Sequence, residues 1–201
     1  MKVLLTGVSC VGKSTIGAEL AALLGMPFFD LDTEVEAFFQ TSIGLLQAQC
    51  GSMHAYRTKA CRVLKALLSR TDAQDCVIAL PPSGLMVPYW NVVKGSRATL
   101  VVVQDDPINI LNRIVFFDND ARPIHKELTP AEHQHYLDEI KQDMKYFGRS
   151  YAKADATVYI EGLGPGEAAK KIKLALDSLP KQNGGDARTR TSRIRWTEHK
   201  S

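Results

Sequence analysis

The chain has 201 residues, 45% of them hydrophobic, and carries 25 basic and 22 acidic side chains, a formal net charge of +3. This length suits one α/β domain with a full core and is too short for two ordinary domains. No apolar run approaches the roughly eighteen residues of a membrane span, so we expect no membrane segment. The cysteines form no C-x-x-C pair and the N-terminus lacks a secretory pattern, which favours reduced thiols and a cytoplasmic protein.

The positive charge is concentrated at the C-terminus. Residues 180–201 hold six Lys or Arg against two Asp or Glu, which leaves 19 basic and 20 acidic side chains in residues 1–179. We therefore expect one domain over 1–179 and a basic, disordered tail over 180–201. The domain has no charge signature for nucleic acid. The tail is interpreted as a solvated C-terminus, with contact to RNA or an acidic partner as the alternative.

The first predicted strand, residues 2–6, leads directly into a phosphate-binding motif. The sequence from residue 7 to residue 14 matches G-x-x-x-x-G-K-[ST], and a helical pattern follows over 13–24, which is the strand–loop–helix order that the motif requires. In such a loop the backbone N–H groups bind phosphate oxygens, the Lys reaches the β- and γ-phosphates, and the Ser ligates Mg²⁺. We predict ATP and Mg²⁺ as ligands. The predicted nucleotide-binding residues here are Gly7, Val8, Ser9, Cys10, Val11, Gly12, Lys13, Ser14 and Thr15.

The second predicted strand, residues 27–30, is followed by two carboxylates, Asp30 and Asp32. In a parallel sheet the ligand crevice lies beyond the carboxyl ends of the strands, so both side chains should face the phosphate loop. One can hold Mg²⁺ through water while the other accepts the proton of an attacking hydroxyl. The structural alternative for Asp32 is that it caps the next helix, predicted over 33–39.

Apolar runs and helical patterns alternate along the rest of the chain. Further strands are predicted over 76–80, 99–104 and 156–161, and further helices over 43–50, 53–68, 107–116, 130–154 and 166–179. This alternation predicts an α/β, P-loop NTPase fold with a five-stranded parallel sheet flanked by helices on both faces. The polar stretch of about 117–128 lies between two helices and is predicted to be a small lid over the nucleotide.

The first part of the chain resembles the shikimate kinase family of P-loop small-molecule kinases. The similar residues are 12–17, Leu20-Ala21, Leu24-Gly25, Pro27-Phe28, 30–32, 41–43 and, after Gly51, Tyr56-Arg57. The resemblance extends over residues 1 to about 176 and is strongest before residue 60. It implies ATP- and Mg²⁺-dependent phosphoryl transfer to a hydroxyl of a small, anionic metabolite.

The resemblance also implies roles for individual residues. It assigns substrate binding to Asp32, Arg57 and Arg149, with Asp32 as the base that contacts the acceptor hydroxyl. It places Arg113 against adenine and Arg122, in the lid, on the phosphates. The implied catalytic residues are Lys13, Asp32 and Arg122, and the implied Mg²⁺ ligands are Ser14 and Asp30.

The segment after the third predicted strand departs from the family pattern. The family has a Gly-Gly-Gly run there, whose amides approach the substrate, and this chain has Leu80-Pro81-Pro82-Ser83-Gly84. The two prolines lack N–H groups and fix φ, so this loop cannot present the same amides. The acidic residue before the family's F-R is also missing, with Met53 and His54 in that region. We therefore expect a kinase with a rebuilt acceptor site and an acceptor other than shikimate.

Two other functions stay open. The Pro81-Pro82 loop would suit a degenerate kinase fold that acts as a nucleotide-binding regulatory module, although the complete phosphate motif favours an active kinase. A nucleoside or nucleotide kinase would need a second arginine cluster for an acceptor phosphate, and only Arg57, Arg62 and Arg149 are candidates. Small kinases of this fold are commonly monomers, and we expect a monomer here.

Overall fold

A parallel six-stranded sheet forms the centre of the molecule. The structure is a computed structural model that describes residues 1–117, 122–180 and 194–196. Its sheet has the order β2-β3-β1-β4-β7-β8, and every pair of neighbouring strands is parallel. The strands are β1 (Lys2–Thr6), β2 (Phe28–Asp30), β3 (Cys76–Ala79), β4 (Thr99–Gln104), β7 (Ala156–Tyr159) and β8 (Ile194–Trp196). The five strands expected from the sequence are confirmed.

The tail contributes the additional edge strand. Residues 194–196 form β8, which pairs with β7 so that Ala156 lies opposite Ile194. The rest of the predicted tail, 181–193 and 197–201, lies outside the described residues. The prediction of disorder therefore does not apply to β8.

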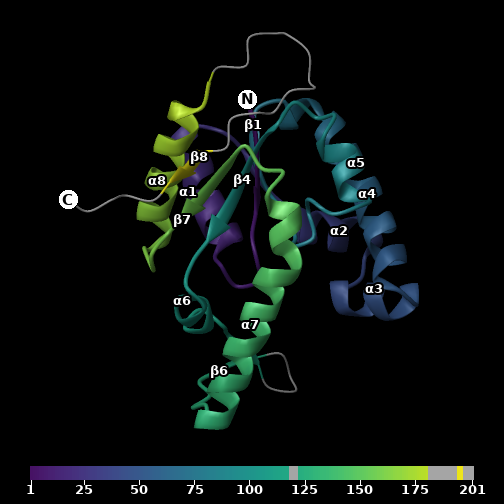
Figure 1. Cartoon of the computed structure of the whole chain (residues 1–201). Coiled ribbons are helices and arrows are strands. Elements are labelled where there is room, and N and C mark those ends of the chain that lie inside the picture. The colour runs from purple at the N-terminus through teal and green to yellow at the C-terminus, as the bar shows by residue number, and fades with distance from the viewer. Residues whose placement is uncertain (118–121, 181–193, 197–201) are drawn as a thin grey trace, which may run out of the picture.

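Burial explains why the sheet reads as short apolar runs. All four residues of β3, and every residue of β1 after Lys2, are buried. Strands covered on both faces need apolar side chains at successive positions, not at alternate ones. Figure 1 shows α1 (Lys13–Leu24) and α8 (Pro165–Ser178) on one side of the sheet, with α4 (Met53–Ser69), α5 (Tyr89–Val93) and α7 (Pro130–Tyr151) on the other. The strand order reverses next to β1, so the crevice of this fold opens at the carboxyl end of that strand.

A group of three helices lies between β2 and β3 in the chain and to the right of the sheet in Figure 1. It consists of α2 (Leu31–Phe39), α3 (Ile43–Cys50) and α4. Hydroxyl caps fix two of the helix starts: Ser42 accepts from the N–H of Leu45, and Ser52 accepts from the N–H of Ala55. This group forms one wall of the crevice beside Asp32.

The segment between β4 and α7 is shorter in helix than predicted. The helix expected over 107–116 ends as α6 (Pro107–Leu111), and the chain then turns into β5 (Phe116–Phe117), which pairs antiparallel with β6 (Pro123–Ile124). Two adjacent phenylalanines favour a strand over a helix. This hairpin occupies the predicted lid, of which residues 118–121 lie outside the described part.

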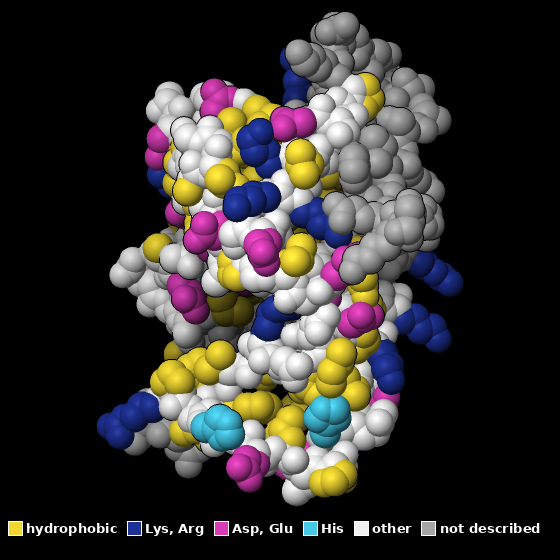
Figure 2. Space-filling view, turned by 90° about the vertical axis from the view of Figure 1, so that its left-hand side faces the viewer, with side chains coloured by type: hydrophobic (Ala, Val, Ile, Leu, Met, Phe, Trp, Pro, Cys, Tyr) yellow, Lys and Arg dark blue, Asp and Glu magenta, His cyan; other side chains and the backbone are white. Residues whose placement is uncertain are grey.

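The described surface shows the mixed charge that the composition of residues 1–179 predicts. On the face seen in Figure 2, Lys and Arg side chains are interspersed with Asp and Glu and are not gathered into blocks of one sign. Within the described ranges, none of the helices is at once long enough and apolar enough to span a bilayer.

Candidate functional site

The phosphate loop joins β1 to α1 and depends on two glycines. A Cβ on Gly7 would lie 2.4 Å from the carbonyl oxygen of Val103 in β4, so only glycine fits there. Gly12 has φ of +100° and directly precedes α1, which begins at Lys13. The loop and Arg113 enclose a hollow of about 420 Å³, lined by Cys10, Gly12, Lys13, Ser14, Thr15 and Arg113. A helix N-terminus that opens onto such a hollow is suited to bind an anion.

Lys13 is the cation of this loop. Its Nζ donates to the carbonyl oxygen of Val8 at 2.9 Å. Burial lowers the pKa of Lys13 to about 8, and the nearby charges of Asp32, Cys10 and Asp30 oppose that shift. The ammonium group is therefore still mostly protonated at neutral pH and would gain from a negatively charged partner.

The side-chain oxygens of Ser14 and Asp30 lie close together and could both act as metal ligands. The Ser14 hydroxyl donates to Oδ2 of Asp30 at 2.5 Å, and Oδ1 of Asp30 accepts from the N–H of Asp32 at 3.0 Å. Asp30 is thus the N-cap of α2, which begins at Leu31. The alternative in which Asp32 caps this helix is wrong, and the Asp32 side chain is left available for other contacts.

Asp32 lies in the first turn of α2, close to Lys13. Burial and the neighbouring Asp30 carboxylate raise the pKa of Asp32, and the Lys13 ammonium opposes this rise. A carboxylate whose pKa is raised holds a proton more readily than an ordinary one does, which suits it to accept a proton during a reaction.

The parts of α4 and α5 near Asp32, where the sequence predicts the acceptor to bind, contain buried polar atoms without protein partners; we call Tyr56, Arg57 and Tyr89 the acceptor wall. Nε of Arg57, on α4, and the hydroxyl of Tyr89, at the start of α5, are buried and make no hydrogen bond within the described part of the chain. Tyr56, next to Arg57, is 4% exposed, and burial together with the Asp32 charge raises its pKa to about 12. Nothing in the sequence marks the unpartnered hydroxyl of Tyr89.

The Pro81-Pro82 loop is folded on itself and held at both ends. The N–H of Gly84 donates to the carbonyl oxygen of Pro81 at 2.8 Å, and the Thr6 hydroxyl donates to the same oxygen at 3.1 Å. At the other end, Nζ of Lys153 donates to the carbonyl oxygen of Leu85 at 2.8 Å. Two positions of this loop have no N–H, and the amide of Gly84 is used internally, so the loop offers few free backbone donors.

The three remaining predicted arginines are placed differently from one another. Arg113 lines the hollow, and its Nη1 lies 2.6 Å from the buried carboxylate of Asp105. Arg122 is exposed and directly precedes β6. Arg149 is exposed in the last turn of α7, where the buried residues are Phe147, Ser150 and Tyr151. Its role as a substrate ligand stays a prediction.

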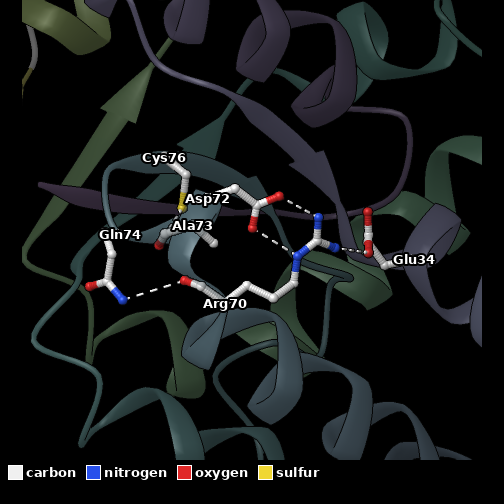
Figure 3. A network of polar contacts seen from close by, with 6 residues as sticks. All are labelled: Glu34, Arg70, Asp72, Ala73, Gln74 and Cys76. Carbon is white, nitrogen blue, oxygen red and sulfur yellow. Dashed lines mark hydrogen bonds and ion pairs between the residues drawn. The ribbon is translucent and has the colours of Figure 1, made fainter.

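A network of polar contacts connects the first turn of α2 to the residues that follow α4 (Figure 3). Arg70, which follows α4, donates through Nε and Nη2 to Asp72 at 2.9 and 2.5 Å and through Nη1 to Glu34 at 3.1 Å. Its guanidinium carbon also lies 5.0 Å from the ring centre of Phe29 in β2. The network is largely exposed, so it links α2 to the start of β3 without adding much stability.

Comparison with known proteins agrees with this geometry. A family model described as shikimate kinase matches residues 9–176. Over 179 residues the chain is 33% identical to the shikimate kinase of Aquifex aeolicus, covering 88% of this chain and 96% of that one, and the crystal structure of that enzyme superposes with a TM-score of 0.66. The shikimate kinase of Salinibacter ruber is 33% identical over 129 residues, which are 64% of this chain and 61% of that relative.

A third relative adds a ligand-bound structure. The shikimate kinase of Acinetobacter baumannii, solved in complex with shikimate, is 25% identical, with a TM-score of 0.67 over 90% of this chain and 95% of that one. The family model covers most of the described domain. This chain belongs to the shikimate kinase family and is a P-loop kinase that transfers phosphate to an alcohol group of a small molecule.

Proposed function

We propose that this protein transfers the γ-phosphoryl group of ATP, bound with Mg²⁺, to a hydroxyl of a small carboxylated polyol, with shikimate as the first acceptor to test. The observation that carries the proposal is the position of Asp32 in the first turn of α2, close to the Lys13 ammonium and to Tyr56 and Tyr89 of the acceptor wall. The relatives named above support shikimate, one of them by its bound ligand, against the different acceptor expected from the Pro81-Pro82 loop. The rebuilt Pro81-Pro82 loop favours an acceptor site that holds its substrate through different groups.

The oxygen donors of Ser14 and Asp30 fit a magnesium ion. Mg²⁺ prefers oxygen ligands and usually takes only one or two from the protein, with water and substrate phosphates completing the octahedron. A hydroxyl and a carboxylate 2.5 Å apart at the end of the phosphate loop supply that set. When bound, the ion would neutralise charge on the β- and γ-phosphates.

Lys13 and the loop amides would hold the phosphates in line with the acceptor. Nζ of Lys13 has a carbonyl partner, Val8, which phosphate oxygens can replace as a stronger, charged acceptor. Burial lowers the pKa of Lys13, and pairing with a negatively charged phosphate would raise it again by stabilising the protonated form. Catalysis in such enzymes is mostly positioning and electrostatic stabilisation, which this arrangement provides.

Asp32 would take the proton of the acceptor hydroxyl. In the reaction, a bond forms between the acceptor oxygen and the γ-phosphorus, and the bond from that phosphorus to the β,γ-bridging oxygen breaks. The hydroxyl proton passes to the Asp32 carboxylate, and the products are ADP and a phosphate monoester. The unpartnered guanidinium of Arg57 would bind the acceptor carboxylate from the adjacent wall, since its planar fork of donors matches a carboxylate.

The test is ADP formation from ATP and Mg²⁺ with shikimate, followed by a panel of small carboxylated polyols. Stimulation by shikimate supports the proposal in full, and stimulation by another carboxylated polyol supports the kinase with a different acceptor. Clear ATP binding without stimulation by any member of the panel would contradict the proposal and would favour a nucleotide-binding regulatory module.

A further inference from the structure

A single buried carboxylate, Asp105, connects three segments at the edge of the nucleotide hollow. Asp105 follows β4 directly and is 0% exposed. Its Oδ1 accepts hydrogen bonds from the N–H of Asp106 at 2.8 Å, from Nδ2 of Asn109 at 2.8 Å and from the N–H of Gly162 at 2.9 Å. A buried charge is tolerated only when it is bonded or paired in this way.

The second oxygen of Asp105 faces Arg113. Oδ2 lies 2.6 Å from Nη1 of Arg113, an ion pair in which that N–H is not aligned for a hydrogen bond. Arg113 is 28% exposed, and its accessible part lines the hollow beside Lys13 and Thr15. Oδ2 also accepts from the N–H of Gly162 at 3.2 Å, so both oxygens bond to the fold and Oδ2 in addition pairs with a residue of the nucleotide site.

The turn after β7 is fitted closely to this carboxylate. Gly162 has φ of +74°, and a Cβ there would lie 3.1 Å from Nδ2 of Asn109, itself bonded to Asp105. The backbone can thus approach Asp105 because residue 162 is glycine. Asp105 therefore holds together the start of α6, the turn after β7 and Arg113.

The pairing also determines what Arg113 can contribute. Its positive charge is largely balanced by Asp105, so it adds little to neutralising phosphates. Its accessible part lines the hollow, and the face of a guanidinium stacks well on aromatic rings such as a nucleobase.

We propose that Asp105 is a positioning residue of the nucleotide site, which holds the guanidinium of Arg113 against the hollow so that its face packs on the base of the nucleotide. This inference rests on the proposed nucleotide site but not on turnover. The base and the phosphates of the ligand are therefore recognised by separate groups, Arg113 with Asp105 for the base and the loop for the phosphates.

The experiment compares two ligands, MgATP and inorganic tripolyphosphate, which has the phosphates but no base. Their dissociation constants are measured by calorimetry for the full chain and for Asp105→Asn, which keeps an oxygen for the three N–H donors but loses the charge that faces Arg113. We expect the Kd for MgATP to rise about tenfold and that for tripolyphosphate to stay within about twofold.

A double-mutant cycle separates positioning from a general loss of structure. Arg113→Met should weaken MgATP as much as Asp105→Asn does, and the double variant should be no weaker than Arg113→Met alone. Additive losses, or equal losses for both ligands, would overturn the proposal. A wild-type protein that binds MgATP no better than tripolyphosphate would overturn it too. A protein that binds MgATP selectively but phosphorylates nothing would refute the proposed kinase function and leave this inference standing.

A second variant covers the case in which Asp105→Asn does not fold. Gly162→Ala changes an exposed turn, carries no charge, and strains it, because the residue has φ of +74° and the new Cβ would lie 3.1 Å from Nδ2 of Asn109. It should weaken MgATP and spare tripolyphosphate, and no change in either ligand would contradict the proposal. The matched control is Asp106→Asn, the neighbouring exposed carboxylate, which should bind both ligands as the wild type does.

Discussion

The phosphate-binding part of the crevice is bonded between near neighbours in the sequence, whereas the acceptor half is bonded between segments far apart. Lys13 bonds to Val8, and Ser14 bonds to Asp30, all within the first thirty residues. On the acceptor half, Thr6 bonds to Pro81 and Lys153 bonds to Leu85, across 75 and 68 residues. Local geometry is encoded by a short motif, so the first half keeps its form while the second can be rebuilt.

The two halves differ in how their polar groups are satisfied. Lys13, Ser14 and Asp30 all have protein partners, but Arg57 Nε and the Tyr89 hydroxyl on the acceptor half have none within the residues described. Buried polar atoms without partners are rare and costly in folded proteins, and one common reason to keep them is a ligand. Lys13, Ser14 and Asp30 are thus satisfied within the protein, and we infer that a substrate would satisfy the buried atoms of the acceptor half.

The strongest way to break this comparison is Asp32→Asn, at the boundary of the two halves. The amide cannot take the hydroxyl proton, so turnover should fall by about 10³-fold, while the Kd for MgATP should change by no more than about twofold. Steady-state kinetics and calorimetry check the two parts. Equal turnover in the variant would show that Asp32 is not the proton acceptor, and Asp106→Asn controls for a loss of one carboxylate.

The pH dependence of kcat/KM should report both halves. Asp32 must be ionised to accept a proton, so activity should fall as the pH drops through its raised pKa. Lys13 must be protonated, so activity should also fall as the pH rises beyond about 8. Each limb should approach a tenfold loss per pH unit, about 1.4 kcal/mol. In Asp32→Asn the acid limb should disappear from the residual activity, and a persistent acid limb would assign it to another group.

The sequence predicts the features of this fold that depend on local patterns better than those that depend on distant contacts. The phosphate loop, the five strands and the closeness of Asp30 to Ser14 were predictable because each depends on a local pattern. The role of Asp30 as the cap of α2 depends on where the helix starts, which sequence patterns place only to within a few residues. Asp105 and Gly162 meet across 57 residues, and no local pattern marks such a pair.

Arg149 shows a different limit. Ile140, Met144, Phe147 and Tyr151 are spaced by three and four residues and pack into the core, so they define the inner face of α7. Arg149 is out of phase with that face. The periodicity of apolar residues along α7 could therefore have indicated that Arg149 is exposed. The partial match to the family pattern could not.

Arg57→Lys would sharpen the comparison on the acceptor half. Lysine keeps the charge but loses Nε and the planar fork, so the KM for a carboxylated acceptor should rise about tenfold. The KM for ATP should stay unchanged. Arg62→Lys, at an exposed position one turn further along α4, is the matched control and should alter neither. An increase in the KM for ATP alone would move Arg57 to the nucleotide half.

The smallest expected effect comes from Tyr89→Phe, and it is informative because of its sign. The hydroxyl of Tyr89 is fully buried without a protein partner, so its removal relieves a desolvation cost and should leave the free energy of unfolding unchanged or raise it by up to about 1 kcal/mol. Thermal unfolding measures this directly.

If the hydroxyl is kept for the acceptor, the same variant should raise the KM for the acceptor a few-fold, because the substrate then loses one hydrogen bond. A stabilised protein with a weaker acceptor site would show that this half of the crevice gives up stability for binding. A destabilised protein with unchanged KM would show that the hydroxyl serves the fold, and the contrast between the two halves would then rest on Arg57 alone.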